Sequence, residues 1–147
     1  MVIGFRPSVW DPTLIVGQII CIQSTFYASE SILLSTSSFF GYMVSLRDIF
    51  SAQVTPRLVV IQLLADCICA LMLSRIVCRA KQCLDFTSTL HFWHILAVIL
   101  YDKIPFQASF WLLQVFSLVI STVLSEYICL QLETREIFLS TNSKYEV

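Results

Sequence analysis

The sequence predicts an all-α membrane protein, a four-helix transmembrane bundle with both termini in the cytosol. Hydrophobic residues make up 57% of the 147 residues and charged residues only 13%, a balance too apolar for a globule in water. The mean hydropathy is +0.81, and long stretches contain no Lys or Arg. Lipid is therefore the expected solvent. A strand barrel would need alternating polarity, which is absent.

Four apolar segments are expected to form the spans. Proline precedes or opens three of them, at Pro12, Pro56 and Pro105, where its missing N–H costs little. The third segment lies between Asp85 and Asp102 and is short for a span, so a re-entrant segment is the alternative. Backbone groups in hydrocarbon must be satisfied within the segment, which predicts helices. The expected spans are residues 13–35, 58–77, 86–101 and 106–130 of one domain, 1–147, whose residues 131–147 form a short cytosolic tail.

The orientation follows from the Lys and Arg residues that flank the segments, because cytosolic flanks carry an excess of them. If the N-terminus lies in the cytosol, the cytosolic flanks contain Arg6, Arg75, Arg79, Lys81, Arg135 and Lys144. The opposite flanks then contain Arg47, Arg57 and Lys103. The excess favours cytosolic termini and a multi-pass topology.

Asp66 is expected near the middle of the bilayer, where an ionised carboxylate costs roughly 2.5 to 3.5 kcal/mol on insertion scales. It must therefore be neutral, paired or hydrated. A structural hydrogen bond to Gln18 or Gln23 is one interpretation, and a proton or ion relay is the other.

His91 and His94 share one helix face, and Glu126 is expected at a comparable depth near the cytosolic interface. Two histidines and one carboxylate are possible zinc ligands, but a tetrahedral site needs a further ligand. We therefore predict no metal and no other cofactor. We find no nucleophile elbow, P-loop or zinc-protease motif. We therefore predict no enzymatic activity and no small-molecule substrate, and the net charge of −1 gives no indication of nucleic-acid binding. The alternative function is a small proton-coupled or ion transporter that uses Asp66, His91, His94 and Glu126.

Small residues are expected where the helices approach one another, because lipid offers helices no hydrophobic drive to associate. They include Gly17, Ser24, Ala28, Ala65, Ala70, Ser117, Ser121 and Ser125. Three cysteines, Cys78, Cys83 and Cys129, lie at the expected cytosolic boundary. Packing and reversible palmitoylation are both open for them.

Three stretches together resemble the Sys-one family of Golgi integral membrane proteins, in collinear order over nearly the whole chain. The first is Val9-Trp10-Asp11-Pro12, with Leu14, Ile15, Gln18, Ile19, Gln23 and Tyr27 behind it. The most specific is Lys81-Gln82-Cys83-Leu84-Asp85-Phe86-Thr87, with Arg79 ahead and Thr89, His91, Phe92 and His94 behind. The last contains Trp111, Gln114, Glu126-Tyr127-Ile128-Cys129, Glu133 and Glu136-Ile137. Ser125, where glycine is expected, and a short connection at Val54-Thr55-Pro56-Arg57 depart from the pattern.

The resemblance implies four spans with cytosolic ends and a receptor in the trans-Golgi network membrane. Such a receptor recruits an Arf-related small GTPase and supports protein targeting and vesicle traffic between endosomes and the Golgi. The GTPase of this family is N-terminally acetylated, and its arrival leads to recruitment of a further Arf-like GTPase and of tethering proteins. The expected partners are thus that GTPase and the lipid bilayer. Our hypothesis places the GTPase contact on Trp10, Asp11, Arg79, Lys81, Gln82, Asp85 and Glu133. In the alternative, Trp10 is an interfacial anchor, and Lys81 and Asp85 only orient and cap helix ends.

Overall fold

The computed structural model describes residues 11–77, 79–102 and 104–145, and the side chains of Leu46 and residues 136–145 are outside this description. Four long helices account for most of these residues, and no strand occurs among them. They are α1 (Pro12–Ser37), α2 (Pro56–Val77), α3 (Ala80–Tyr101) and α4 (Ala108–Tyr145). Two short 3-10 turns, η1 (Ser38–Phe40) and η2 (Leu46–Asp48), lie between α1 and α2.

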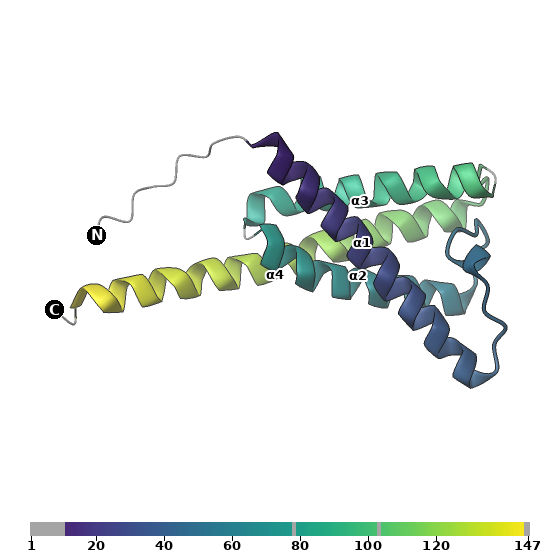
Figure 1. Cartoon of the computed structure of the whole chain (residues 1–147), viewed down its shortest axis with the longest axis horizontal. Coiled ribbons are helices and arrows are strands. Elements are labelled where there is room, and N and C mark those ends of the chain that lie inside the picture. Colours follow the sequence, from purple (N-terminus) through teal and green to yellow (C-terminus); the bar gives the residue numbers. More distant parts are fainter. Residues whose placement is uncertain (1–10, 78, 103, 146–147) are drawn as a thin grey trace.

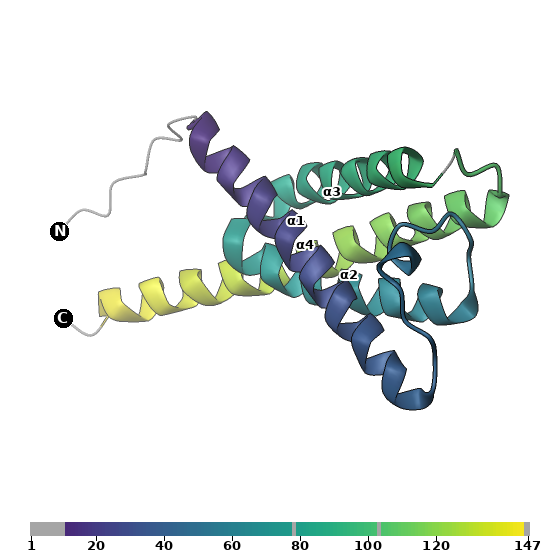
Figure 2. The same ribbon diagram turned by 45° about the vertical axis from the view of Figure 1, so that its right-hand side comes forward.

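The helices α2 and α4 run in the same direction, α3 runs antiparallel to them, and α1 crosses them obliquely (Figures 1 and 2). The starts of α1 and α3 and the ends of α2 and α4 lie at one end of the bundle, here called the terminal end. The turns between α1 and α2 and the connection between α3 and α4 lie at the other end, here called the loop end. The last turns of α4 extend beyond the bundle at the terminal end.

Local chemistry explains several helix boundaries. Asp11 caps α1, because its carboxylate accepts a hydrogen bond from the Thr13 amide at 3.1 Å. Gly41 has a φ of 82°, a conformation that glycine adopts without steric cost, and it ends η1. At the loop end, the carboxylate of Asp102 accepts a hydrogen bond from the Ala52 amide at 3.2 Å. This contact ties the end of α3 to the turns that precede α2.

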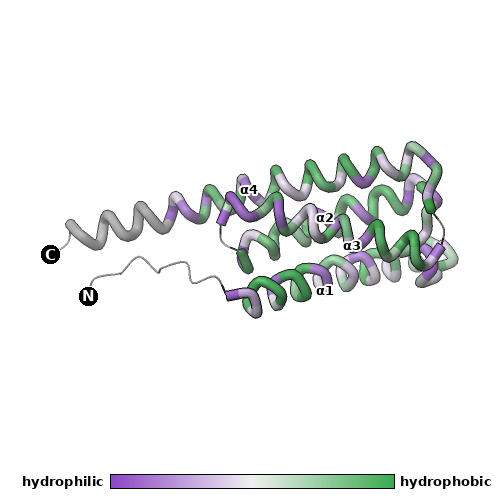
Figure 3. The backbone as a smooth tube through the Cα atoms, turned by 90° about the horizontal axis from the view of Figure 1, so that it is seen from above, coloured by the Kyte–Doolittle hydropathy of each residue, from purple (hydrophilic) through white to green (hydrophobic). Residues whose placement is uncertain are grey.

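The centre of the bundle combines a few large apolar side chains with many small ones. Phe26 and Leu73 are almost fully buried. Among the small residues expected at helix contacts, five are buried: Ala65, Ala70, Ser117, Ser121 and Ser125. Gly17, Ser24 and Ala28 are instead exposed on α1. Large apolar side chains cover the outside of the helices, and Figure 3 shows hydrophobic residues along their length. A surface of this kind suits lipid.

The structure agrees with the predicted all-helical class and differs in two details. Among the described residues, three helices are long and apolar enough to cross a membrane, namely α2, α3 and residues 108–135 of α4, and α1 is not one of them. The polar side chains of Gln18, Gln23 and Glu30, together with its many hydroxyl residues, reduce the hydropathy of α1. The third helix begins at Ala80, well before the predicted span at 86, so its 22 residues are sufficient for a crossing.

Candidate functional site

The candidate contact residues gather at the terminal end, on the starts of α1 and α3 and on α4. Asp11, Arg79, Lys81, Gln82 and Asp85 are exposed, and Glu133 is half-buried. We call these six residues the terminal-end surface. Trp10, which belongs to the same hypothesis, lies outside the described residues. Because Ala80 begins α3, Lys81, Gln82 and Asp85 lie on its first turns rather than in a loop.

Glu133 connects α4 to the start of α3. Its carboxylate accepts a hydrogen bond from the backbone amide of Ala80 at 3.4 Å. The first amides of a helix have no partner within the helix and carry a partial positive charge, so a carboxylate there is stabilising. Glu133 therefore positions the helix turn that presents Lys81 and Gln82, which is a structural role within the terminal-end surface.

An open pocket of about 240 Å³ lies between the first half of α1 and the start of α3. The apolar side chains of Ile15, Ile19 and Phe86 line it, together with polar groups of Gln82, Asp85 and Thr89. An apolar floor with a few polar groups is the usual composition of a binding site. Two of the candidate contact residues, Gln82 and Asp85, thus belong to a concave surface.

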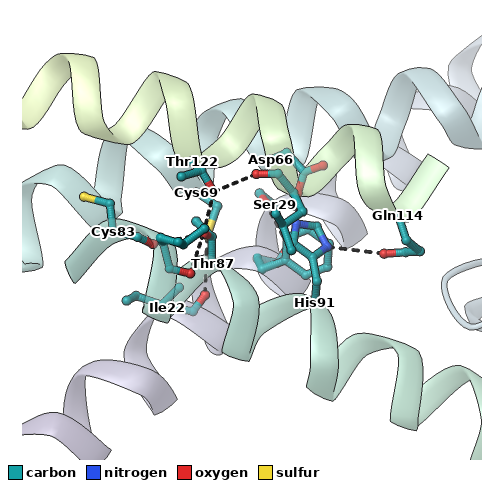
Figure 4. Close-up of polar contacts among 12 residues, drawn as sticks. Ile22, Ser29, Asp66, Cys69, Cys83, Thr87, His91, Gln114 and Thr122 are labelled. Atoms are coloured by element: carbon teal, nitrogen blue, oxygen red, sulfur yellow. Dashed lines mark hydrogen bonds and ion pairs between the residues drawn. The ribbon is translucent and has the colours of Figure 1, made fainter. Parts of the chain in front are cut away.

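A second group of polar side chains lies inside the bundle. We call it the buried polar cluster, and it contains Glu30, Gln62, Asp66, His91, His94, Gln114, Ser117 and Ser121, all less than a tenth exposed. Within the cluster, His91 lies beside Asp66 and Gln114 (Figure 4). Its Nδ1 lies 3.2 Å from the amide oxygen of Gln114, and its Nε2 lies 3.9 Å from Oδ1 of Asp66. The second distance is within the range of an ion pair but longer than a hydrogen bond.

The cluster differs from the one expected from sequence. Asp66 approaches His91, Ser117 and Ser121 rather than Gln18 or Gln23. The side-chain amide of Gln18 instead donates to the carbonyl of Ile76 at 3.2 Å, while Oε1 of Gln23 is buried without a hydrogen-bond partner.

Glu126 lies apart from the two histidines. The contacts between α3 and α4 show why: Gln114 is level with His91, Thr122 with Thr87 at 2.8 Å, and Cys129 with Cys83. Glu126 comes between the last two levels, and His91 and His94 lie further toward the loop end. Among the described residues, no group of three or more His, Cys, Asp or Glu side chains could hold a metal ion.

The two candidate palmitoylation cysteines that the structure describes face each other. Cys83 and Cys129 are almost fully buried, and their sulfur atoms lie 3.6 Å apart between α3 and α4. In this conformation neither thiol is exposed to an acyltransferase, which favours the packing interpretation. Cys78 lies outside the described residues.

Sequence reasoning did not single out Glu30 as a site residue. Glu30 is buried, and its carboxyl lies close enough to that of Asp66 for like charges to repel. One signal was available: Glu30 follows Phe26 by four residues, so the two share a helix face. Phe26 is the largest fully buried side chain among the described residues, so that face points into the bundle.

Comparison with known proteins identifies the family of this chain. A protein family described as an integral membrane protein S linking to the trans Golgi network matches residues 5–139. A protein from Nematostella vectensis named Protein SYS1 homolog is 37% identical over 151 residues, which cover 97% of this chain and 96% of that protein. A protein of the same name from Dictyostelium discoideum is 31% identical over 141 residues, and the match covers 90% of this chain and 61% of that relative. No solved structure matches significantly. The family match covers most of the chain, and this membrane protein therefore belongs to the SYS1 family.

Proposed function

We propose that this chain is a receptor in the trans-Golgi network membrane that recruits an Arf-related small GTPase and thereby supports Golgi targeting and vesicle traffic between endosomes and the Golgi. A GTPase with one weak membrane signal binds a bilayer only marginally, and a second contact makes the attachment stable and specific for one organelle. The terminal-end surface offers such a contact. The pocket that Gln82 and Asp85 line, beside the exposed Lys81, is the observation on which the assignment depends.

We propose further that all four helices cross the membrane, with the terminal end in the cytosol. The 26 residues of α1 span about 39 Å, more than the roughly 30 Å of a hydrocarbon core. Within the bundle, Arg75, Arg79, Lys81 and Arg135 lie toward the terminal end, and Arg47 and Arg57 lie at the loop end. This distribution agrees with cytosolic placement of the terminal end.

The topology predicts that epitope tags at both chain ends bind antibody in cells whose plasma membrane alone has been permeabilised. A tag inserted after Gly41, in the exposed turn at the loop end, should bind antibody only after the Golgi membrane is also opened. Protection of one terminal tag, with access to the other, would contradict four crossings.

The contact surface predicts the behaviour of a triple variant, Lys81→Ala, Gln82→Ala and Asp85→Ala. Its affinity for the GTP-bound GTPase should fall at least about tenfold, or about 1.4 kcal/mol, because charged and polar groups at a contact set orientation and specificity. The measurement is recovery of the GTPase by the detergent-solubilised full chain. A variant with Gln131, Thr134 and Arg135 replaced by alanine is the matched control, since these residues are exposed on α4 near the terminal end.

Recovery of the GTPase by the triple variant at the wild-type level, with equal expression, would remove Lys81, Gln82 and Asp85 from the contact. A loss that is equal in the control variant would indicate a general electrostatic effect of this end of the molecule. Loss in the triple variant alone supports the proposed surface.

A further inference from the structure

Many polar atoms of the buried polar cluster make no hydrogen bond within the protein. Apart from serine hydroxyls, seven of its buried side-chain atoms have no hydrogen-bond partner. They are both carboxylate oxygens of Asp66, Oε2 of Glu30, Nε2 of His91, Nδ1 of His94, and the amide nitrogens of Gln62 and Gln114. The hydroxyls of Ser117 and Ser121 approach Asp66, but neither meets the geometry of a direct hydrogen bond. Burying a polar group without a partner costs free energy, and an isolated charge costs more. Donors and acceptors occur together here, a combination that suits water and protons.

The contacts of His91 indicate where its protons lie. Its Nδ1 must donate to Gln114, because the group that it contacts is the amide oxygen. The other ring nitrogen, Nε2, faces a carboxylate oxygen of Asp66. Lone pairs on both atoms would repel across this 3.9 Å contact, so a proton on either of them is favoured. Either Asp66 carries it and is neutral, or His91 carries it and forms an ion pair with the carboxylate. In both forms the pair has no net charge, which is the least costly state for a buried pair.

Space for water, which can carry protons, lies toward the loop end of the cluster. A small pocket of about 20 Å³ is lined by Glu30, Gln62 and His94, and also by Asp48, Ser51 and Gln53 of the loop end. A volume above about 10 to 15 Å³ with several polar neighbours is enough for one water molecule. Asp48, which lies where the pocket meets the loops, pairs with Arg57 at 3.2 Å.

We propose that the buried polar cluster is a proton-binding site, in which Asp66 and His91 share one proton that is exchanged through water held by Glu30, Gln62 and His94. The proton comes from water at the loop end, is held by Asp66 Oδ1 or His91 Nε2, and leaves by the same route. Each packed element contributes to the site: α1 through Glu30, α2 through Asp66 and Gln62, and α3 through both histidines. The contribution of α4 is the uncharged Gln114, Ser117 and Ser121. The proposed receptor function does not require this site.

The chain offers a direct observation of the site, because His91 and His94 are its only histidines. Nitrogen-15 labelling of histidine in the full chain, reconstituted in nanodiscs, therefore gives NMR resonances from the cluster alone. The ring resonances of His91 should change with pH over the interval in which the pair releases its shared proton. In Asp66→Asn this response should disappear, since the partner that shares the proton is gone.

Two further variants separate the proton-binding site from a merely structural role. In Glu30→Gln, the response of His91 should remain while the exchange of ring protons with deuterated water slows several-fold, because the water loses a partner. The matched control is Glu126→Gln, a carboxyl-to-amide change on α4 outside the cluster, and it should match wild type. If Asp66→Asn does not fold, the wild-type and Glu30→Gln spectra still distinguish a proton-binding site from a structural role.

Three outcomes would overturn the proposal. The first is a wild-type spectrum in which the ring resonances of His91 do not change with pH. The second is an unchanged His91 response in Asp66→Asn. The third is a change of the His91 resonances on adding sodium at constant pH, which would assign the cluster to a metal cation instead of a proton.

Discussion

Phe26→Ala is expected to lower the free energy of unfolding by roughly 3 kcal/mol, the low end of the range for phenylalanine truncations in protein cores. The Phe26 ring is fully buried and meets His94 edge-on with centroids 5.5 Å apart and Tyr27 likewise at 5.5 Å. Lipid is as apolar as the side chain, so the transfer part of the loss is small. The lost packing contacts and the cavity remain.

The measurement for Phe26→Ala is reversible unfolding in mixed micelles with increasing dodecyl sulfate. Phe116→Ala is the matched control: this side chain is 56% exposed on the outside of α4, and its truncation should change stability by about 0.5 kcal/mol or less. Equal losses in the two variants would mean that Phe26 packs no better than a lipid-facing residue. In that case Phe26 of α1 would not be packed tightly against His94 of α3.

The fold class was predictable because lipid imposes strict rules on a chain. Long apolar segments must be helical, and proline at 12 and 56 marks two starts correctly. Helix ends outside the apolar part were less predictable. The start of α3 at Ala80 depends on Glu133, which is distant in sequence and accepts the hydrogen bond of the Ala80 amide. Hydropathy contains no information about such a cap.

The sequence predicted that Asp66 has polar neighbours inside the bundle, but it did not predict which residues these are. Asp66 required a polar environment on energetic grounds alone, and it has one in the cluster. Which helix supplies the partner depends on how the helices rotate about their axes, and this follows from small side chains that allow close approach. The glutamines of α1 were expected to reach Asp66, whereas His91 and the serines of α4 do so.

Those serines give a second prediction of large effect. Ser117, Ser121 and Ser125 recur every four residues on α4 and are almost fully buried. Ser117 and Ser121 approach Asp66 of α2, so this row of small side chains lies where α4 meets α2. Close approach allows van der Waals packing between the helices, which stabilises their association in lipid, where the hydrophobic effect does not. Ser121→Leu should therefore force the two helices apart and destabilise the protein by about 1 to 3 kcal/mol.

The same change on the outer face of α4 separates close packing from hydrophobicity. Val123, two residues further along, is 61% exposed, and Val123→Leu should leave the dodecyl sulfate midpoint almost unchanged. If leucine at 121 stabilised the bundle, apolar burial rather than close approach would hold α2 against α4. A strong loss at 121 alone, restored by glycine or alanine at that position, would show instead that the space between the helices accepts only a small side chain.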